Sequence, residues 1–294
     1  MKILLTGGMG FLGTHIRRRL QKEGMEVVLF DRSMKGSHNY EEEVFQGDIR
    51  DKSSVKDAVA RVEGVIHLAG ILGTQECIQD PYPAVETNII GGLNVLEAVS
   101  HYKVPAVFNG VGNHFMDNTY SITKTTIERF INMYNAERGA RVNLVRLVNA
   151  YGPGQTPAAP YGPSKVRKVV PSFICRALAH DPIEVYGEGD QIADMVWAGD
   201  VAEATLRALR AAENGNIYPA IEVGPEAHVT VLELAEFIKE LTSSDSEIVH
   251  LPQRPGEAKR DVVADTSTME VIDFSPDDLM PLREGMIETI RYYQ

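Results

Sequence analysis

The chain has 294 residues, of which 44% are hydrophobic and 24% are charged, and its formal net charge at pH 7 is −12. This length suits about two domains, or one large α/β unit with an addition, and the apolar content excludes a disordered protein. The negative charge argues against nucleic-acid binding, which needs a basic face, but it does not exclude a small anionic ligand.

The composition also limits the setting in which the protein works. No stretch is apolar for the roughly 18 residues that a membrane span needs, so we expect no membrane partner. Because strand-like residues 2–6 directly follow Met1, we expect no secretory signal. Cys77 and Cys175 are too few for a disulfide framework, and no His, Cys and carboxylate set has metal-ligand spacing. We therefore predict a cytoplasmic protein without a metal.

Strand and helix patterns alternate through the first half of the chain. A short apolar strand at Ile3–Leu5 is followed by a helix from Phe11 to Glu23. Further strands are predicted, in chain order, at Val27–Phe30, Val44–Phe45, Val65–Leu68, Ala106–Phe108 and Val142–Leu147. Helices are predicted from about Ser53, Asn88 and Tyr120. This alternation produces crossover units, so the predicted fold class is α/β with a doubly wound parallel (Rossmann) sheet.

The pattern changes after Tyr151. Residues 152–163 are rich in Pro, Gly and Ala and lack periodicity, which predicts a loop. Further on, Thr230 and Glu233 form a capping box that predicts the start of a helix. We expect a first domain at 1–150 and a smaller, partly discontinuous region at 151–294, some segments of which return to the first domain.

Three glycines, Gly7, Gly10 and Gly13, stand between the first strand and the first helix. Glycines at such a turn let the backbone approach a pyrophosphate, whose charge then lies at the helix N-terminus. Asp31 ends the second strand 18 residues after Gly13. A carboxylate there accepts hydrogen bonds from the ribose hydroxyls of NAD and repels the extra phosphate of NADP, whereas the adjacent Arg32 favours NADP. The turn and Asp31 together predict NAD as the cofactor.

The glycine turn resembles the extended short-chain dehydrogenase/reductase superfamily, in particular its nucleotide-sugar epimerases and dehydratases. Five later segments are similar to that family in the same order: His67–Gly70, Asn88–Ala98, Arg146–Gln155, Val185–Gln191 and Arg254–Glu257. The resemblance therefore extends along nearly the whole chain. Together with the end of the third strand, it implies NAD contacts from Gly7, Gly10, Phe11, Leu12, Asp31, Arg32, Asp48, Ile49, Leu68, Ala69, Gly70, Asn88, Tyr120 and Lys124.

Tyr120 and Lys124 are four residues apart, and thus on one face of a predicted helix. A phenol with its ordinary pKa of about 10 is a poor base at neutral pH. A neighbouring ammonium and the positive nicotinamide ring favour the phenolate, so we expect them to lower the pKa of Tyr120. The same spacing occurs by chance in many helices, but here it stands at the family's position. We predict that Tyr120 and Lys124 are catalytic.

The sequence departs from the family around the fifth strand. Val111 stands where the family places a Ser or Thr that bonds the reacting hydroxyl, and a valine can neither donate nor relay a proton. Gly112 and Asn113 follow, where the family's 4,6-dehydratases have an Asp–Glu pair and its decarboxylases keep a Glu. The stretch from there to Tyr120 is also shorter than is typical of the family.

The substrate region departs from the family once more. Ala193 stands where the family commonly has an Arg that binds the diphosphate. We expect Arg254 to make the main diphosphate contact, with Lys168 or Arg167 compensating for the missing guanidinium. The resemblance also assigns Val111, Asn149 and Glu257 to the substrate pocket. We interpret His67 and Cys77 as structural residues and expect His114 near the active site.

We predict an NAD-dependent epimerase of a nucleotide-diphosphate sugar, specifically a UDP-sugar 4-epimerase that works through a transient 4-keto sugar. A dehydratase or a ketoreductase of the same family is an alternative. A non-catalytic NAD-binding protein is a further one, which Val111 favours and the Tyr120–Lys124 pair opposes. Because the family commonly dimerises through the helices near Asn88 and Tyr120, we also expect a homodimer.

Overall fold

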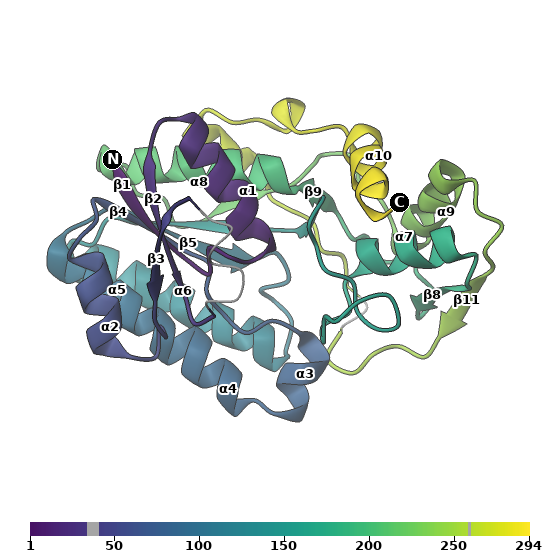
Figure 1. The fold of residues 1–294 in the computed structure, drawn as a ribbon, viewed down its shortest axis with the longest axis horizontal. Coiled ribbons are helices and arrows are strands. Elements are labelled where there is room, and N and C mark those ends of the chain that lie inside the picture. The colour runs from purple at the N-terminus through teal and green to yellow at the C-terminus, as the bar shows by residue number, and fades with distance from the viewer. Residues whose placement is uncertain (34–40, 258–259) are drawn as a thin grey trace.

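A seven-stranded parallel sheet forms the centre of the protein, whose computed structural model describes residues 1–33, 41–257 and 260–294 (Figure 1). The strand order is β10-β6-β5-β4-β1-β2-β3. The strands are β1 (Lys2–Thr6), β2 (Glu26–Asp31), β3 (Glu43–Gln46), β4 (Gly64–His67), β5 (Ala106–Val111), β6 (Val142–Leu147) and β10 (Ile221–Val223). The order reverses at β1, which creates the switch point of a doubly wound sheet. The predicted fold class is confirmed.

Side chains of the sheet alternate between two hydrophobic cores, one on each face. Ile3 and Leu5 belong to the core that is covered by α1 (Phe11–Lys22), α8 (Ala198–Glu213) and η3 (Thr266–Ile272). Leu4 belongs to the opposite core, which is covered by α2 (Lys52–Val59), α5 (Gly92–Tyr102) and α6 (Thr119–Arg138). Figure 1 shows these two helical layers on either side of the sheet. Because both faces are covered, β1 is a continuous apolar run.

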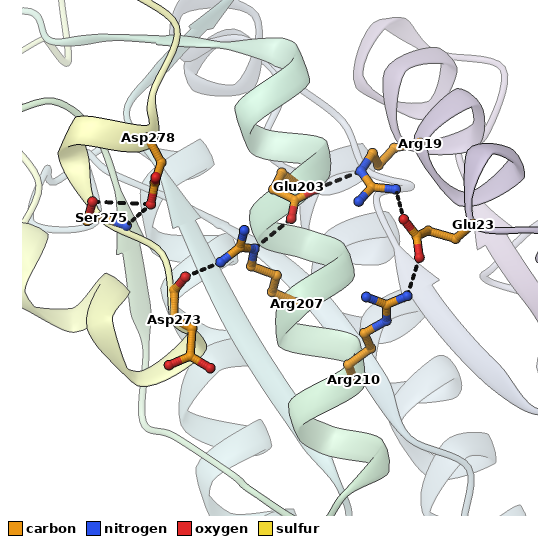
Figure 2. A network of polar contacts seen from close by, with 8 residues as sticks. All are labelled: Arg19, Glu23, Glu203, Arg207, Arg210, Asp273, Ser275 and Asp278. Carbon is orange, nitrogen blue, oxygen red and sulfur yellow. Dashed lines mark hydrogen bonds and ion pairs between the residues drawn. The ribbon is translucent and has the colours of Figure 1, made fainter.

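Charged side chains join α1 to α8 at the edge of the first core (Figure 2). Glu203 of α8 accepts hydrogen bonds from Arg19 Nε of α1 and from Arg207 Nε, each at 2.6 Å. Arg207 also donates to the carbonyl oxygen of Asp273, directly after η3. One carboxylate and one guanidinium thereby connect three segments that lie far apart in the sequence.

The segment between β4 and β5 corrects one helix boundary. It contains α3 (Thr74–Gln79), α4 (Tyr82–Ala84) and the π-helical η2 (Val85–Gly91), which continues into α5. The helix predicted from Asn88 therefore begins earlier, at Tyr82, and Asn88 lies inside η2. Pro81 and Pro83 lie at the start of this helix, where a missing N–H costs little, so they do not prevent helix formation there.

The C-terminal region has a separate hydrophobic core. It is formed by α7 (Val169–Ala179), α9 (Val231–Thr242), α10 (Leu282–Tyr293) and the parallel pair β8 (Ile183–Tyr186) and β11 (Ile248–Leu251). The predicted capping box of Thr230 and Glu233 is present at the start of α9. A second parallel pair, separate from the main sheet, is formed by β7 (Asn149–Tyr151) and β9 (Met195–Trp197). The short helix η4 (Pro276–Asp278) precedes α10 in the chain.

Two further properties concern only the part of the chain that the structure describes. Its helices lack the length and apolar character that a membrane crossing requires. Its His, Cys, Asp and Glu side chains do not gather into any group of three or more that could hold a metal ion.

Candidate active site

A cavity of about 610 Å³ lies along the carboxyl edge of the main sheet. Its walls come from the glycine turn after β1, from residues at the ends of β2 to β6, and from the first turns of α6. Loops of the C-terminal region close the opposite side. Open α/β sheets bind their ligands at this edge, so the cavity is the candidate active site.

Most of the residues that the sequence singles out line this one cavity: Gly7, Gly10, Phe11, Leu12, Asp31, Arg32, Asp48, Ile49, Leu68, Ala69, Gly70, Val111, Tyr120, Lys124, Asn149, Lys168, Arg254 and Glu257. Asn88 is not on the wall. Its Oδ1 accepts a hydrogen bond from the backbone N–H of Ile71 at 2.8 Å, and its Nδ2 donates to Thr123 Oγ1 at 3.0 Å. Asn88 therefore links the loop after β4 to α6, and the expectation that it contacts the cofactor stays a prediction.

The glycine turn leaves no room for side chains. A Cβ on Gly13 would lie 2.6 Å from the carbonyl oxygen of Gly8, and a Cβ on Gly7 would lie 2.9 Å from the backbone nitrogen of Ala69. No side chain caps the start of α1 at Gly10, and its first turn contains no acidic residue. The N–H groups at this helix end therefore remain available to an anion, which fits the pyrophosphate of a dinucleotide.

Charged side chains surround the ends of β2 and β3. Asp31 lines the cavity and accepts a hydrogen bond from the backbone N–H of Ser33 at 3.2 Å. Arg50 pairs with Asp48 at 2.7 Å and thereby lowers the pKa of that carboxyl. Arg32 lies 4.0 Å from the same carboxylate. Asp48 therefore partly neutralises the charge of Arg32. This weakens the attraction of the ends of β2 and β3 for the extra phosphate of NADP.

Tyr120 and Lys124 both line the cavity from the first turns of α6. Burial raises the pKa of Tyr120, and the nearby Cys77 thiol adds to this effect. Burial lowers the pKa of Lys124 to about 8, against the opposing charge of Glu128. In the protein alone the loss of hydration therefore keeps the proton on Tyr120, and the predicted lowering of its pKa by Lys124 together with the bound nicotinamide stays a prediction.

Val111 ends β5, is buried and lines the cavity. The backbone N–H of Gly112 donates to the carbonyl oxygen of Leu147 at 2.6 Å, so the pairing of β5 with β6 continues past the end of the strand. Asn113 lines the cavity as well, with its Nδ2 3.7 Å from Met116 Sδ. Residues 111–113 therefore bring no titratable side chain to the site.

The substrate side of the cavity contains two paired arginines. Arg254 contacts Glu257 through Nε at 2.9 Å and Nη2 at 2.7 Å, and its guanidinium lies 4.6 Å above the ring of Tyr186. Arg167 forms an ion pair with Glu184 through Nη1, which also donates to Tyr186 Oη at 2.7 Å. Glu257 thus occupies Nε and Nη2 of the Arg254 guanidinium. The Nη1 group is left to bind an anion.

Sequence reasoning missed two charged residues of the wall, Glu76 and Arg260. Glu76 raises the pKa of Lys168, although burial, the larger effect, lowers it. The Arg260 guanidinium lies 6.0 Å from the centre of the Phe115 ring and forms no ion pair within the described residues. One signal was available for Arg260, because it stands six residues after Arg254 in the same loop.

The two histidines and the cysteine discussed above are not on the cavity wall. His67 is buried with Nδ1 2.8 Å from Thr6 Oγ1, and burial lowers its pKa to about 3, so it stays neutral and supports the strand ends. Cys77 is buried in packing. His114 packs edge-on against Phe115, so the structure does not bring its ring to the site as expected.

Comparisons with known proteins agree with this geometry. Residues 3–224 match the sequence model of the family described as the NAD dependent epimerase/dehydratase family. The chain is 31% identical to UDP-N-acetyl-alpha-D-glucosaminuronate decarboxylase of Bacillus cytotoxicus, over 100% of this chain and 98% of that protein.

Two solved structures superpose along the whole chain. UDP-glucose 4-epimerase of Thermus thermophilus in complex with NAD is 28% identical, with a TM-score of 0.86 and coverage of 100% of this chain and 99% of that one. UDP-glucose 4-epimerase of Thermotoga maritima with UDP-glucose is 27% identical, with a TM-score of 0.88 and coverage of 100% and 98%. The chain therefore belongs to the NAD-dependent epimerase/dehydratase family and is an NAD-dependent enzyme.

Proposed function

We propose that the enzyme interconverts the C4 epimers of a nucleotide-diphosphate sugar, specifically a UDP-sugar, through a transient 4-keto sugar. One observation carries the proposal: the Tyr120–Lys124 pair and the glycine turn share one cavity in which residues 111–113 offer no acid or base. An epimerase needs only one group that takes and returns the C4 hydroxyl proton. The two 4-epimerase structures with similar folds support the same activity.

The residues of the cavity fit NAD. We assign the pyrophosphate to the glycine turn, the adenosine ribose to Asp31, and the nicotinamide ribose to Lys124. Ile49 and Asp48 stand at the end of β3, where they would border the adenine. Bound NAD supplies a reversible acceptor for the hydride of C4.

Tyr120 moves the proton in this proposal. Its Oη takes the proton of the C4 hydroxyl when the sugar is oxidised and returns it when the keto group is reduced. Because Val111 cannot relay a proton, O4 of the sugar must approach Tyr120 Oη directly, within about 2.6–3.2 Å. Burial keeps the proton on the free phenol, so deprotonation depends on the positive charge of Lys124 and of the bound cofactor.

We assign the diphosphate of the substrate to Arg254, supported by Lys168 and Arg260. All three line the substrate side of the cavity. Arg167 is a weaker choice than the sequence suggested, because Glu184 and Tyr186 already occupy its Nη1 group. The guanidinium that is missing at Ala193 is thus replaced by cations from other loops.

A nucleotide-uronate decarboxylase is the second candidate. The 31% identical relative carries that name, and Glu76 brings a carboxylate to the cavity wall from α3. Elimination of water is less compatible with the site, because it needs both a base for C5 and an acid for the leaving hydroxyl. Gly112 and Asn113 supply neither of them.

Incubation with UDP-, dTDP-, GDP- and CDP-sugars in D₂O, with NMR of the products, tests these alternatives. A 4-epimerase forms the C4 epimer with no deuterium on carbon, because the hydride never exchanges with water. Release of CO₂ from a nucleotide uronate would establish the decarboxylase instead. Accumulation of a 4-keto-6-deoxy or a 5,6-unsaturated product would refute the assignment.

We further propose that the protein is a homodimer whose interface covers η2 and α6. Both elements expose large apolar side chains, including Ile90 (49% exposed) and Ile122 (52% exposed). Met133 is also exposed, and it lies on the same face of α6 as Ile122 because eleven residues make about three helical turns. Ile122→Glu should give a monomer in sedimentation experiments. Val271→Glu, at an exposed apolar position on η3, is the control and should remain dimeric.

A further inference from the structure

A buried carboxylate lies behind the cavity wall, next to the Tyr120–Lys124 pair. Glu128 follows Lys124 by one turn of α6 and is only 3% exposed. Its Oε2 accepts hydrogen bonds from Arg146 of β6, at 2.8 Å from Nη2 and 3.2 Å from Nε. Arg146 also pairs with Glu222 of β10 at 2.7 Å. The three side chains form a network of two carboxylates and one guanidinium.

The second oxygen of Glu128 has no partner. Glu128 Oε1 is buried and makes no hydrogen bond, which is rare for a buried carboxylate. It lies against Gly110, where an added Cβ would be only 2.8 Å away. Gly110 lines the cavity beside Val111, and a glycine inside a strand often marks such a close approach. The free oxygen therefore lies against the backbone of a residue that lines the cavity.

We propose that Glu128 is a positioning residue whose charge keeps the Lys124 side chain protonated inside the cavity. Side chains four residues apart on a helix are neighbours, which places Glu128 beside the stem of Lys124. Within the described residues, Lys124 Nζ makes no hydrogen bond or ion pair, with Glu128 or with any other group, so Glu128 acts on it through its electric field and not by direct contact. Arg146 holds the Glu128 carboxylate, so that the charge stays in place when the lysine moves toward a ligand.

Other titratable groups on the elements around α6 do not replace Glu128. They include His67 on β4, Glu76 and Cys77 on α3, Glu86 on η2, Glu97 on α5, Arg146 on β6 and Glu222 on β10. Glu86 pairs with Arg50, and Glu76 acts on Lys168. His67 stays neutral, Cys77 faces Tyr120, and Glu97 binds Tyr134 and Arg138 further along α6. Burial lowers the pKa of Lys124 to about 8, and Glu128 opposes that shift. Without Glu128, the pKa of the amine would fall further.

The Glu128→Gln and Glu222→Gln variants form a matched pair that tests the proposal. Each removes one charge from the Arg146 network and keeps an oxygen that accepts from Arg146, but only Glu128 is next to Lys124. The rate of Lys124 acetylation by acetic anhydride is measured against pH by mass spectrometry of the full-length protein. We expect Glu128→Gln to lower the Lys124 midpoint by about one pH unit, and Glu222→Gln to leave it unchanged.

An equal shift in both variants would overturn the proposal, because the effect would then belong to the network as a whole. An unchanged midpoint in Glu128→Gln would overturn it too. If Glu128→Gln does not fold, Glu128→Asp is used, in which the charge is withdrawn by one methylene and the midpoint should fall by a smaller amount. An unchanged Lys124 midpoint in Glu128→Asp would then contradict the proposal.

The labelling needs neither cofactor nor substrate, so its outcome is independent of the proposed 4-epimerase activity. With an active substrate, the alkaline limb of the kcat profile should move to lower pH in Glu128→Gln by the same amount. Glu222→Gln should keep the wild-type profile. A shifted labelling midpoint without turnover would refute the proposed function and leave the role of Glu128 intact.

Discussion

Asn118 Nδ2 donates a hydrogen bond to the carbonyl oxygen of Gly256 at 3.0 Å. The same side chain caps α6, because its Oδ1 accepts from the backbone N–H of Ser121 at 3.0 Å. One buried amide thus connects the helix that carries Tyr120 to the loop that carries Arg254. This amide therefore fixes the position of Tyr120, the proposed acid and base, relative to Arg254, the proposed diphosphate ligand.

Two substitutions at Asn118 separate its functions. Asn118→Ser keeps an N-cap oxygen but is too short to reach Gly256, so the free energy of unfolding should change little while KM for the nucleotide sugar rises. Asn118→Ala removes both contacts and should cost about 1 kcal/mol of stability as well. Urea unfolding and steady-state kinetics measure the two effects. Equal KM values in wild type and Asn118→Ser would show that the loop does not depend on this bond.

Tyr120→Phe should abolish turnover and leave NAD affinity nearly intact, because it removes the acid and base but no ribose contact. General acid–base groups typically contribute 10²–10⁴-fold to the rate. Lys124→Met should damage both turnover and NAD binding. Calorimetric titration with NAD and product analysis measure the two properties, and more than about a tenth of the wild-type rate in Tyr120→Phe would contradict its assigned role.

Asp31 should make NAD bind at least about tenfold more tightly than NADP, a difference of roughly 1.4 kcal/mol. The carboxylate repels the extra phosphate, and Asp48 partly neutralises the nearby Arg32. In Asp31→Ser the preference should shrink, since the repulsion is lost and Arg32 remains. Titration of both variants with both cofactors provides the test, and equal affinities in wild type would remove Asp31 as the determinant.

Arg254→Gln should raise KM for the nucleotide sugar more than it lowers kcat, because the diphosphate contact is the same in the ground state and the transition state. Arg167→Gln serves as the control. Its guanidinium is already held by Glu184, so KM should change much less. A larger KM effect in Arg167→Gln than in Arg254→Gln would place the diphosphate at the other arginine.

Asp200 should make stability depend on pH. Burial raises the pKa of this carboxyl to about 6, although it accepts a hydrogen bond from the backbone N–H of Met280 at 2.8 Å. The folded state therefore binds more protons than the unfolded state between about pH 4 and 6, so stability falls as the pH rises through that window.

Asn at position 200 can still accept the hydrogen bond but never carries the charge. Relative to wild type, Asp200→Asn should gain on the order of 1 kcal/mol between pH 4 and pH 7, because partial exposure reduces the full linkage value. Urea unfolding at several pH values measures the gain. A difference between the two proteins that does not change with pH would exclude Asp200 as its source.

Most of the central sheet could be predicted because its strands are short apolar segments that alternate with helices, as β1, β3, β4 and β5 each do. β10 escaped prediction, since Ile221–Val223 is too short to show a period and belongs to the sheet only through its pairing with β6. The start of the helix at Tyr82 was missed because no capping residue with a polar side chain marks it.

The residues of the cavity also divide into those that could be predicted from the sequence and those that could not. Residues next to strand ends, such as Asp31 and Val111, could be placed because parallel strands bring their carboxyl ends to one edge. Glu76 comes from the short helix α3 and Arg260 from a loop, and the position of both depends on tertiary packing, which no local pattern encodes. The raised pKa of Tyr120 in the protein alone was not foreseen for a related reason, because burial of the phenol is a property of the assembled cavity.

The position of β10 at the edge of the main sheet has a consequence for biosynthesis. Val145 and Leu147 of β6 share a core with Val201 and Leu206 of α8, which leave the ribosome more than fifty residues later. Until then, α1 is the one helix of the described chain that covers this face, the β6 end of the face lacks α8, and β6 has no outer neighbour. A ribosome-bound chain that ends near residue 150 therefore presents an open strand and a bare apolar surface, the kind of intermediate that chaperones bind.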